Sequence, residues 1–162
     1  PNNIEWSIVQ MATARIGAIM VCLNPAYRPD ELAFAINNVQ VKYLVMAQSF
    51  KQSNYVAMLK ELAPEIEDDR SDSLAQPLSL SMLPSLKFIY TIGDKPVDRL
   101  LPFSALQKEP AESLRIKLTE IEAELSADDN INIQFTSGTT GKPKGKHRKR
   151  VGKAYGNHRK TM

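Results

Sequence analysis

The first half of the chain alternates between amphipathic stretches with helical spacing and short, continuous apolar runs. Ile4, Ile8 and Met11 recur at helical intervals, which predicts a first helix that Asn2 caps and Gly17 ends. The apolar run 18–23 predicts a buried strand that Asn24 and Pro25 terminate. The alternation then repeats, with a helix from about residue 29, a strand at 43–46 and a helix at about 51–62.

Helices that alternate with buried strands at this pitch predict an α/β fold with a parallel sheet between helices. Residues 65–84 are acidic and then rich in Ser and Pro, so we expect a surface loop there. Alternating apolar residues predict a third strand at 86–92, and residues 114–125 have the spacing of an amphipathic helix. A further apolar strand at 131–135 leads directly into a segment rich in glycine.

Composition limits the chain to one domain with a real core, because it has 162 residues of which 43% are hydrophobic. The formal charge of +3 is misleading, since Lys and Arg gather in residues 146–162 and no acid lies there. The body of the chain is therefore mildly acidic, and its basic character belongs to a terminal segment. These cations are Lys146, Arg148, Lys149, Arg150, Lys153, Arg159 and Lys160.

Compartment and membrane signals are weak. The single cysteine, Cys22, excludes an internal disulfide and fits a reducing, intracellular environment, where we expect it to be a buried thiol. The longest apolar run is too short to span a bilayer, so we expect no membrane span. The chain begins at Pro1 without a charged leader, and we expect that an N-terminal part with any targeting segment is missing.

The segment 136–145 carries the clearest chemistry. Glycines allow close approach of the backbone and positive φ, so that successive N–H groups can surround an anion. Hydroxyl groups add neutral donors and lysines add positive charge. Such a loop suits a polyphosphate. The candidate ligand residues are Thr136, Ser137, Gly138, Thr139, Thr140, Gly141, Lys144 and Gly145, with Lys142 a weaker candidate.

The residues of this loop allow two other interpretations. The loop of P-loop NTPases needs four residues between its glycines and a Ser or Thr after its lysine. Here two residues separate Gly138 from Gly141, and Pro143 follows Lys142, so that interpretation fails. An ordinary solvated turn is the plainer alternative, because the same residue types gather in loops. The length of the ordered pattern after a strand favours the phosphate site.

The loop resembles the phosphate loop of the adenylate-forming (AMP-binding) superfamily, which includes acyl-CoA synthetases, luciferases and peptide-synthetase adenylation domains. Residues 1–6, 14–19, 24–27 and 129–136 are also similar to acyl-CoA synthetases, and most similar to the medium-chain fatty acid–CoA ligases. The resemblance implies that residues 1–145 form part of the large N-terminal domain, a truncated three-layer scaffold around a parallel sheet. Trp6, Gly17, Asn24 and Pro25 need only structural roles, in the core or in turns.

The resemblance implies a reaction in two steps. A fatty acid carboxylate attacks the α-phosphate of ATP to give an acyl-adenylate and pyrophosphate, and the thiol of CoA then displaces AMP. Mg²⁺ and the loop offset the charge of the triphosphate. The same resemblance implies a mitochondrial location. Another branch of the superfamily, luciferase-like or peptide-synthetase, would differ only in its substrate.

The pattern of the family breaks after Gly145, where residues 146–162 form a basic segment without apolar periodicity that we expect to be disordered. An artefact of splicing, frameshift or gene modelling explains this segment better than nucleic-acid binding, which we do not expect. In members of the family, the other active-site residues lie further along the sequence, beyond the segment that corresponds to this chain. We therefore assign no catalytic and no metal-binding residue here, and predict that this fragment alone has no ligase activity. The alternative is a non-catalytic truncated isoform whose basic tail binds nucleic acid or a protein partner.

Overall fold

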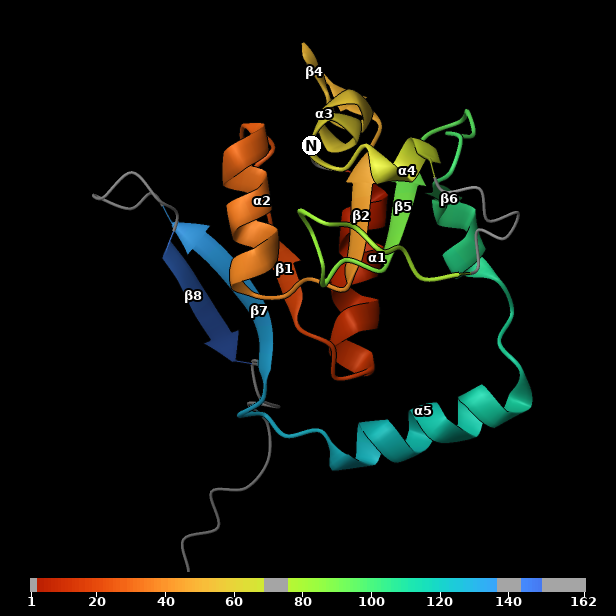
Figure 1. The fold of residues 1–162 in the computed structure, drawn as a ribbon. Helices are drawn as coiled ribbons and strands as arrows, with labels where there is room; N and C mark the ends of the chain where they lie inside the picture. Colours follow the sequence, from red (N-terminus) through yellow and green to blue (C-terminus); the bar gives the residue numbers. More distant parts are fainter. Residues whose placement is uncertain (1–2, 69–75, 137–143, 150–162) are drawn as a thin grey trace, which may run out of the picture. The chain divides into compact units, whose positions relative to one another are not determined.

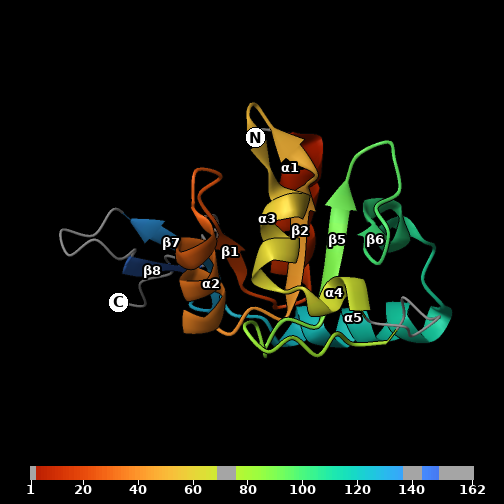
Figure 2. The ribbon, with the colours of Figure 1, turned by 45° about the horizontal axis from the view of Figure 1, so that its top comes forward.

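The computed structural model describes residues 3–68, 76–136 and 144–149, and these residues divide into two compact units. Unit 1 consists of residues 23–109, and unit 2 combines residues 3–22 with residues 110–136 and 144–149. Each unit contains its own three-stranded sheet. Figures 1 and 2 show the elements of both units from two directions.

The sheet of unit 1 is parallel. Strand β2 (Tyr43–Ala47) pairs with β5 (Phe88–Ile92), which pairs in turn with β6 (Leu101–Pro102). Together with the parallel pair in unit 2, this confirms the predicted α/β fold with parallel strands. The other elements of unit 1 are the short hairpin β3 (Ser49–Phe50) and β4 (Ser53–Asn54), the helices α2 (Pro29–Asn38), α3 (Tyr55–Leu62) and α4 (Glu65–Asp68), and the 3₁₀ helix η1 (Phe103–Gln107).

The core of unit 1 lies on one face of this sheet. Along β5, Ile89 and Thr91 are buried and the other three residues are only half-buried, as expected when successive side chains of a strand point to opposite faces. Helices α2 and α3 supply the side chains that cover Ile89, and Leu59 is fully buried among them. The cluster contains Ala33, Ile36, Leu44, Leu59, Leu62, Ala63, Ile66, Leu80, Leu83, Leu86, Ile89 and Leu100.

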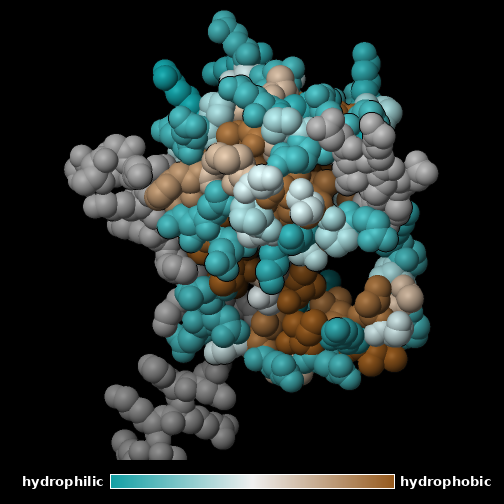
Figure 3. All heavy atoms as spheres, viewed as in Figure 1, coloured by the Kyte–Doolittle hydropathy of each residue, from teal (hydrophilic) through white to brown (hydrophobic). Residues whose placement is uncertain are grey.

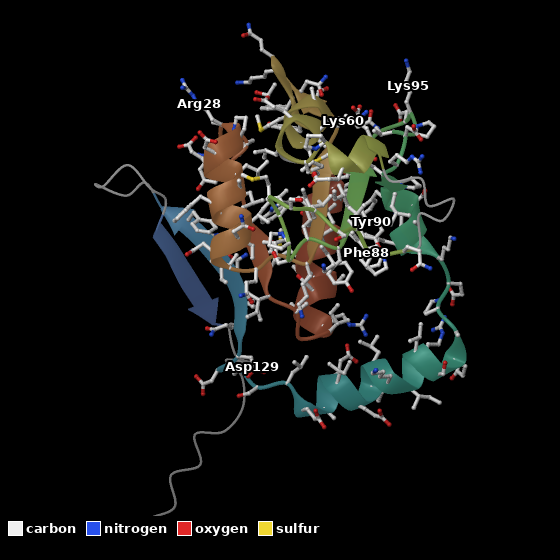
Figure 4. All side chains as sticks on the ribbon, in the orientation of Figure 1. Arg28, Lys60, Phe88, Tyr90, Lys95 and Asp129 are labelled. Carbon is white, nitrogen blue, oxygen red and sulfur yellow. The ribbon has the colours of Figure 1, made fainter. Side chains whose placement is uncertain are left out.

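The opposite face of the sheet carries aromatic residues. Tyr43 and Phe88 are register partners, and their rings stack with centroids 5.5 Å apart and planes inclined by 11°. Figure 4 shows Phe88 and Tyr90 close together on β5. Partial burial, and then the neighbouring Tyr43, raise the pKa of the Tyr90 phenol above its ordinary value.

Unit 2 is built from both ends of the chain. Helix α1 (Ile4–Arg15) and strand β1 (Met20–Cys22) come from the N-terminal part, and helix α5 (Glu112–Glu124) with strands β7 (Asn130–Thr136) and β8 (Lys144–Lys149) from the C-terminal part. Strand β7 lies between β1 and β8. The two helices meet near their C-terminal ends, where Arg15 pairs with Glu122 at 2.6 Å.

Several predicted boundaries were wrong. Asn3, and not Asn2, caps α1, because its side chain accepts the N–H of Trp6 at 3.1 Å. The helix predicted from residue 51 begins at Tyr55, where Asn54 caps it and a hairpin occupies residues 49–54. The predicted surface loop 65–84 contains α4, and its Leu80 and Leu83 are part of the buried core. The strand predicted at 18–23 is reduced to β1, whose residues are half-buried rather than buried.

Gly17 ends α1 as predicted, with a φ of +71° that favours glycine. A Cβ at this position would lie 3.0 Å from the side chain of Leu125, so the glycine also allows α5 to approach the turn. Among the described residues, no helix has the length and apolar character needed to cross a membrane.

We expect Leu59→Ala to destabilise unit 1 by about 2–5 kcal/mol, because it removes a fully buried side chain and leaves a cavity. The matched control is Leu106→Ala, since Leu106 is 48% exposed and should cost about 0.5 kcal/mol or less. Amide hydrogen exchange across β2 and β5 measures both. Equal losses of protection in the two variants would contradict this assignment of the core.

Candidate functional site

The predicted phosphate loop lies between the two strands of a hairpin. Strand β7 runs up to Thr136, and the chain returns antiparallel to it as β8 from Lys144. Thr136 and Lys144 are register partners, and so are Phe135 and Gly145. The hairpin therefore fixes the two ends of the loop next to each other, and residues 137–143 connect them.

Three of the predicted ligand residues belong to these strands. Thr136 is the last residue of β7, and Lys144 and Gly145 are the first two of β8. The structure thus brings the backbones of Thr136 and Lys144, at the two ends of the motif, next to each other. Ser137, Gly138, Thr139, Thr140 and Gly141, together with Lys142, lie outside the described residues.

The strand that delivers the loop is the central strand of its sheet. β1 pairs with β7 in parallel, with Met20 opposite Asn132 and Cys22 opposite Gln134. Ile133 of β7 is 6% exposed and is the buried hydrophobic residue of unit 2 among those described. β7 has a neighbour on both sides: the ladder with β1 extends to Gln134, and the ladder with β8 continues to Thr136, the residue before the loop.

A buried polar contact joins β1 to β7. Asn132 is 4% exposed, and its side-chain Nδ2 donates to Cys22 Sγ at 3.4 Å. A buried amide without a partner is costly, so this contact favours one register of the two strands. Cys22 is thus half-buried beside a polar partner, where a fully buried thiol was expected. The signal in the sequence was the polar Asn132 between the apolar residues Ile131 and Ile133.

A turn fixes the other end of β7. The Asp129 carboxylate accepts the backbone N–H of Ser126 at 2.6 Å, and the N–H of Asp129 donates to Ser126 O at 3.2 Å. Figure 4 shows Asp129 where the chain leaves α5 and enters β7. An Asp that bonds to the backbone nearby stabilises this kind of turn. The strand before the loop is therefore defined at its start as well as at its end.

The residue types at the loop suit an anion better than a metal. The segment 136–145 contains hydroxyls, glycines and lysines but no carboxylate, so it offers donors to phosphate oxygens and no ligand for Mg²⁺. Among the described residues, no group of three or more His, Cys, Asp or Glu side chains could hold a metal ion. The prediction that the segment binds the polyphosphate part of a nucleotide is consistent with these residue types. A magnesium ion bound with the nucleotide would take its ligands from the phosphates and from protein groups outside this segment.

The motif at residues 24–27 is a turn in unit 1. The Asn24 side chain accepts the N–H of Ala26 at 2.9 Å, and the N–H of Tyr27 donates to Asn24 O at 3.0 Å. The phenol of Tyr55, on α3, donates to Pro25 O at 3.0 Å. The structural role expected for Asn24 and Pro25 is confirmed, and Tyr55 holds the turn, which the sequence did not indicate.

Strand β8 was not predicted. It extends to Lys149, so the first four residues of the expected basic tail pair with β7. The run of basic residues gave no apolar signal for a strand, and the antiparallel partner β7 supplies the pairing instead. Residues 150–162 of the expected tail lie outside the described residues.

Comparison with known proteins identifies relatives of this chain. The family described as AMP-binding enzyme matches residues 1–149. A protein of Danio rerio named medium-chain acyl-CoA ligase ACSF2, mitochondrial, is 38% identical over 158 residues, which are 96% of this chain and 25% of that protein. The Homo sapiens protein of the same name is 41% identical over 152 residues, 90% of this chain and 23% of its own length. The chain thus spans about a quarter of the length of these relatives.

Solved structures show the same fold. An anthranilate CoA ligase, AuaEII, in complex with anthranoyl-AMP matches with a TM-score of 0.59 at 22% identity, over 93% of this chain and 24% of its own. The luciferase-like enzyme from the mealworm Zophobas morio matches with a TM-score of 0.58 at 17% identity, over 93% of this chain and 29% of its own.

We expect Asn132→Ala to weaken the pairing of β1 with β7 by about 1 kcal/mol, or roughly fivefold in hydrogen-exchange protection, because Cys22 loses its buried partner. Asn130→Ala is the matched control, since Asn130 lies on the same strand and is exposed. Amide exchange at residues 20–22 and 130–136 measures the effect. Unchanged protection in Asn132→Ala would show that the contact does not hold the strands.

Proposed function

Because the chain belongs to the AMP-binding enzyme family, we propose that it is the part of a medium-chain fatty acid–CoA ligase that binds the phosphates of ATP. The observation that carries this proposal is the hairpin of β7 and β8, which pairs Thr136 with Lys144 across the ends of the loop. This pairing fixes the two ends of the loop next to each other before the nucleotide arrives, which lowers the entropy cost of binding.

The proposed role of the loop is to bind the β- and γ-phosphates of ATP. In the complete enzyme, a fatty acid carboxylate attacks the α-phosphate and pyrophosphate leaves, and CoA then takes the acyl group from AMP. The negative charge on pyrophosphate grows as it departs, and donors already aimed at it stabilise that charge. Thr136, Gly138, Lys144 and Gly145 would therefore act by position and charge, without a covalent step.

The names of the relatives support a proposal for the substrate class and the location. The curated relatives are named as mitochondrial medium-chain acyl-CoA ligases, and we extend both the acyl chain class and the compartment to the complete form of this protein. Mg²⁺ would accompany ATP and CoA would be the second substrate.

We expect Lys144→Ala to weaken ATP binding about tenfold, because a charge-assisted contact to the γ-phosphate is worth about 1.5–3 kcal/mol. Lys146→Ala is the matched control, since it removes the same charge from the same strand outside the motif and should change affinity about twofold or less. Broadening of the ³¹P resonances of ATP on titration with protein measures this weak binding. Pyrophosphate should displace ATP and AMP should not, and displacement by AMP alone would refute the assignment.

We expect the isolated chain to show no ATP–pyrophosphate exchange with medium-chain fatty acids above the level of its Lys144→Ala variant. Adenylation needs several groups held together, and the chain spans only about a quarter of its relatives. The complete human relative, assayed in parallel, is the positive control. Robust exchange by the wild-type chain that Lys144→Ala abolishes would overturn this prediction.

A further inference from the structure

Strand β8 carries a positive charge that no acid on the described strands of unit 2 opposes. Its sequence is Lys-Gly-Lys-His-Arg-Lys, and neither β7 nor β1 contains a charged residue. β8 is also an outer strand, since the order of the sheet is β1-β7-β8. Figures 1 and 2 show it beside β7. Unit 2 therefore has a sheet edge whose formal charge is entirely positive.

The register spreads these cations along a line. Lys144, Lys146 and Arg148 occupy alternate positions of β8, so they share one face of the hairpin. A strand rises about 3.3 Å per residue, so the backbone from Lys144 to Arg148 spans about 13 Å. A single phosphate group cannot contact both ends of such a series. A polyanion can, because its charges repeat along its length.

Two further features of β8 suit phosphate oxygens. As an outer strand, it has backbone N–H groups that no neighbouring strand pairs with in the described part of the chain. Gly145 lies among the cations, and a glycine within a strand lets a ligand approach the backbone closely. Backbone N–H groups and the side chains of Lys and Arg are among the donors that proteins use for the nucleic-acid backbone. This edge therefore offers both kinds of donor.

The cations on the helices of unit 2 lie beside acids. Helix α5 contains Arg115 and Lys117, but it also contains four Glu residues. On α1, Arg15 pairs with Glu122 of α5 at 2.6 Å. Figure 3 shows apolar residues over the region that α5 occupies in Figure 1. A polyanion would meet like charges and apolar surface there, so among the described elements of unit 2 it fits β8 best.

We propose that β8 binds the phosphate backbone of nucleic acid without reading its base sequence. Lys146, Arg148 and Lys149 supply most of the affinity, because each cation that neutralises a phosphate releases counterions. Nucleic-acid binding was not expected from the sequence, which predicted a disordered segment from Lys146 onward. The pairing of residues 146–149 with β7 instead gives these cations a regular spacing. The proposal does not depend on nucleotide binding, because the three cations lie outside the phosphate loop.

An anionic membrane fits β8 less well. Segments that bind at a membrane interface combine cations with apolar side chains that enter the lipid. β8 consists of five basic residues and Gly145, so it has no apolar side chain to insert. Its charge alone is suited to a polymer of phosphates in water.

The test is the fluorescence anisotropy of a labelled DNA duplex of arbitrary sequence, titrated with the full chain. The variant combines Lys146→Gln, Arg148→Gln and Lys149→Gln. At about 50 mM salt we expect it to bind the duplex about tenfold or more weakly than the wild-type chain. The slope of log affinity against log salt concentration should fall in magnitude by about 2–3, because each lost phosphate contact removes about 0.9.

The matched control combines Lys95→Gln, Lys108→Gln and Lys117→Gln, which removes the same charge from three exposed positions outside β8. It should lower the affinity about threefold or less, because salt screens charges that do not touch the DNA. A further variant, Lys146→Arg with Lys149→Arg, keeps the charge of β8 and should retain the affinity within about twofold.

Several outcomes would overturn the proposal. The first is a wild-type chain that does not bind the duplex, or whose affinity does not fall as salt is raised. Equal losses in the two Gln variants would show that net charge alone is responsible, and loss of binding in the Arg variant would exclude the charge of β8 as the cause. A strong preference among duplexes of different sequence would contradict binding through the phosphates. Binding to vesicles of anionic phospholipid, and not to DNA, would assign β8 to a membrane instead.

Discussion

The pairing of β7 with two neighbours from different parts of the chain determines the geometry of the candidate site. Cys22 on β1 contacts Asn132 on β7 although 110 residues separate them in the sequence, whereas β8 follows β7 after one loop. A parallel pair has no short connection, so the entropy of closing this long segment must be offset by contacts elsewhere. The buried amide of Asn132 and the side chain of Ile133 contribute at this point. A motif that is local in the sequence thus depends on a strand from the opposite end of the chain.

The strongly patterned parts of the chain were predictable. A proline followed by acids indicated the start of α2, where the Glu31 carboxylate accepts the backbone N–H of Arg28 at 2.9 Å. A glycine after an apolar stripe indicated the end of α1 at Gly17, and the run before the glycine-rich loop became β7. In these cases local capping and hydrophobic period agree with the tertiary structure. The loop itself was recognisable because glycines, hydroxyl groups and lysines in one short segment are suited to binding an anion.

Other features depend on contacts that no local pattern contains. β8 has a cation at almost every position and becomes a strand only because β7 offers a partner. Leu80 and Leu83 looked like part of a polar loop, yet they complete the core because α3 and the sheet leave room for them. The hairpin before Tyr55 replaced the first turn of a predicted helix, since Asn54 provides a cap at that point. The stripe of Ile4, Ile8 and Met11 shows the converse, a core-like pattern that remains exposed.

The position of β8 also affects how the sheet of unit 2 behaves toward other chains. β8 is an outer strand, and five of its six residues, Lys144, Lys146, His147, Arg148 and Lys149, are basic. A strand from another molecule that paired with it would have to bring its own backbone against this row of basic residues, and natural proteins use such rows to discourage fibril growth. In the part of the chain that the structure describes, the other outer strand of this sheet is β1, whose sequence Met-Val-Cys has no charged residue. Pairing with a strand of another molecule should therefore begin at the β1 edge. The basic residues of β8 make the opposite edge of the sheet resist such pairing.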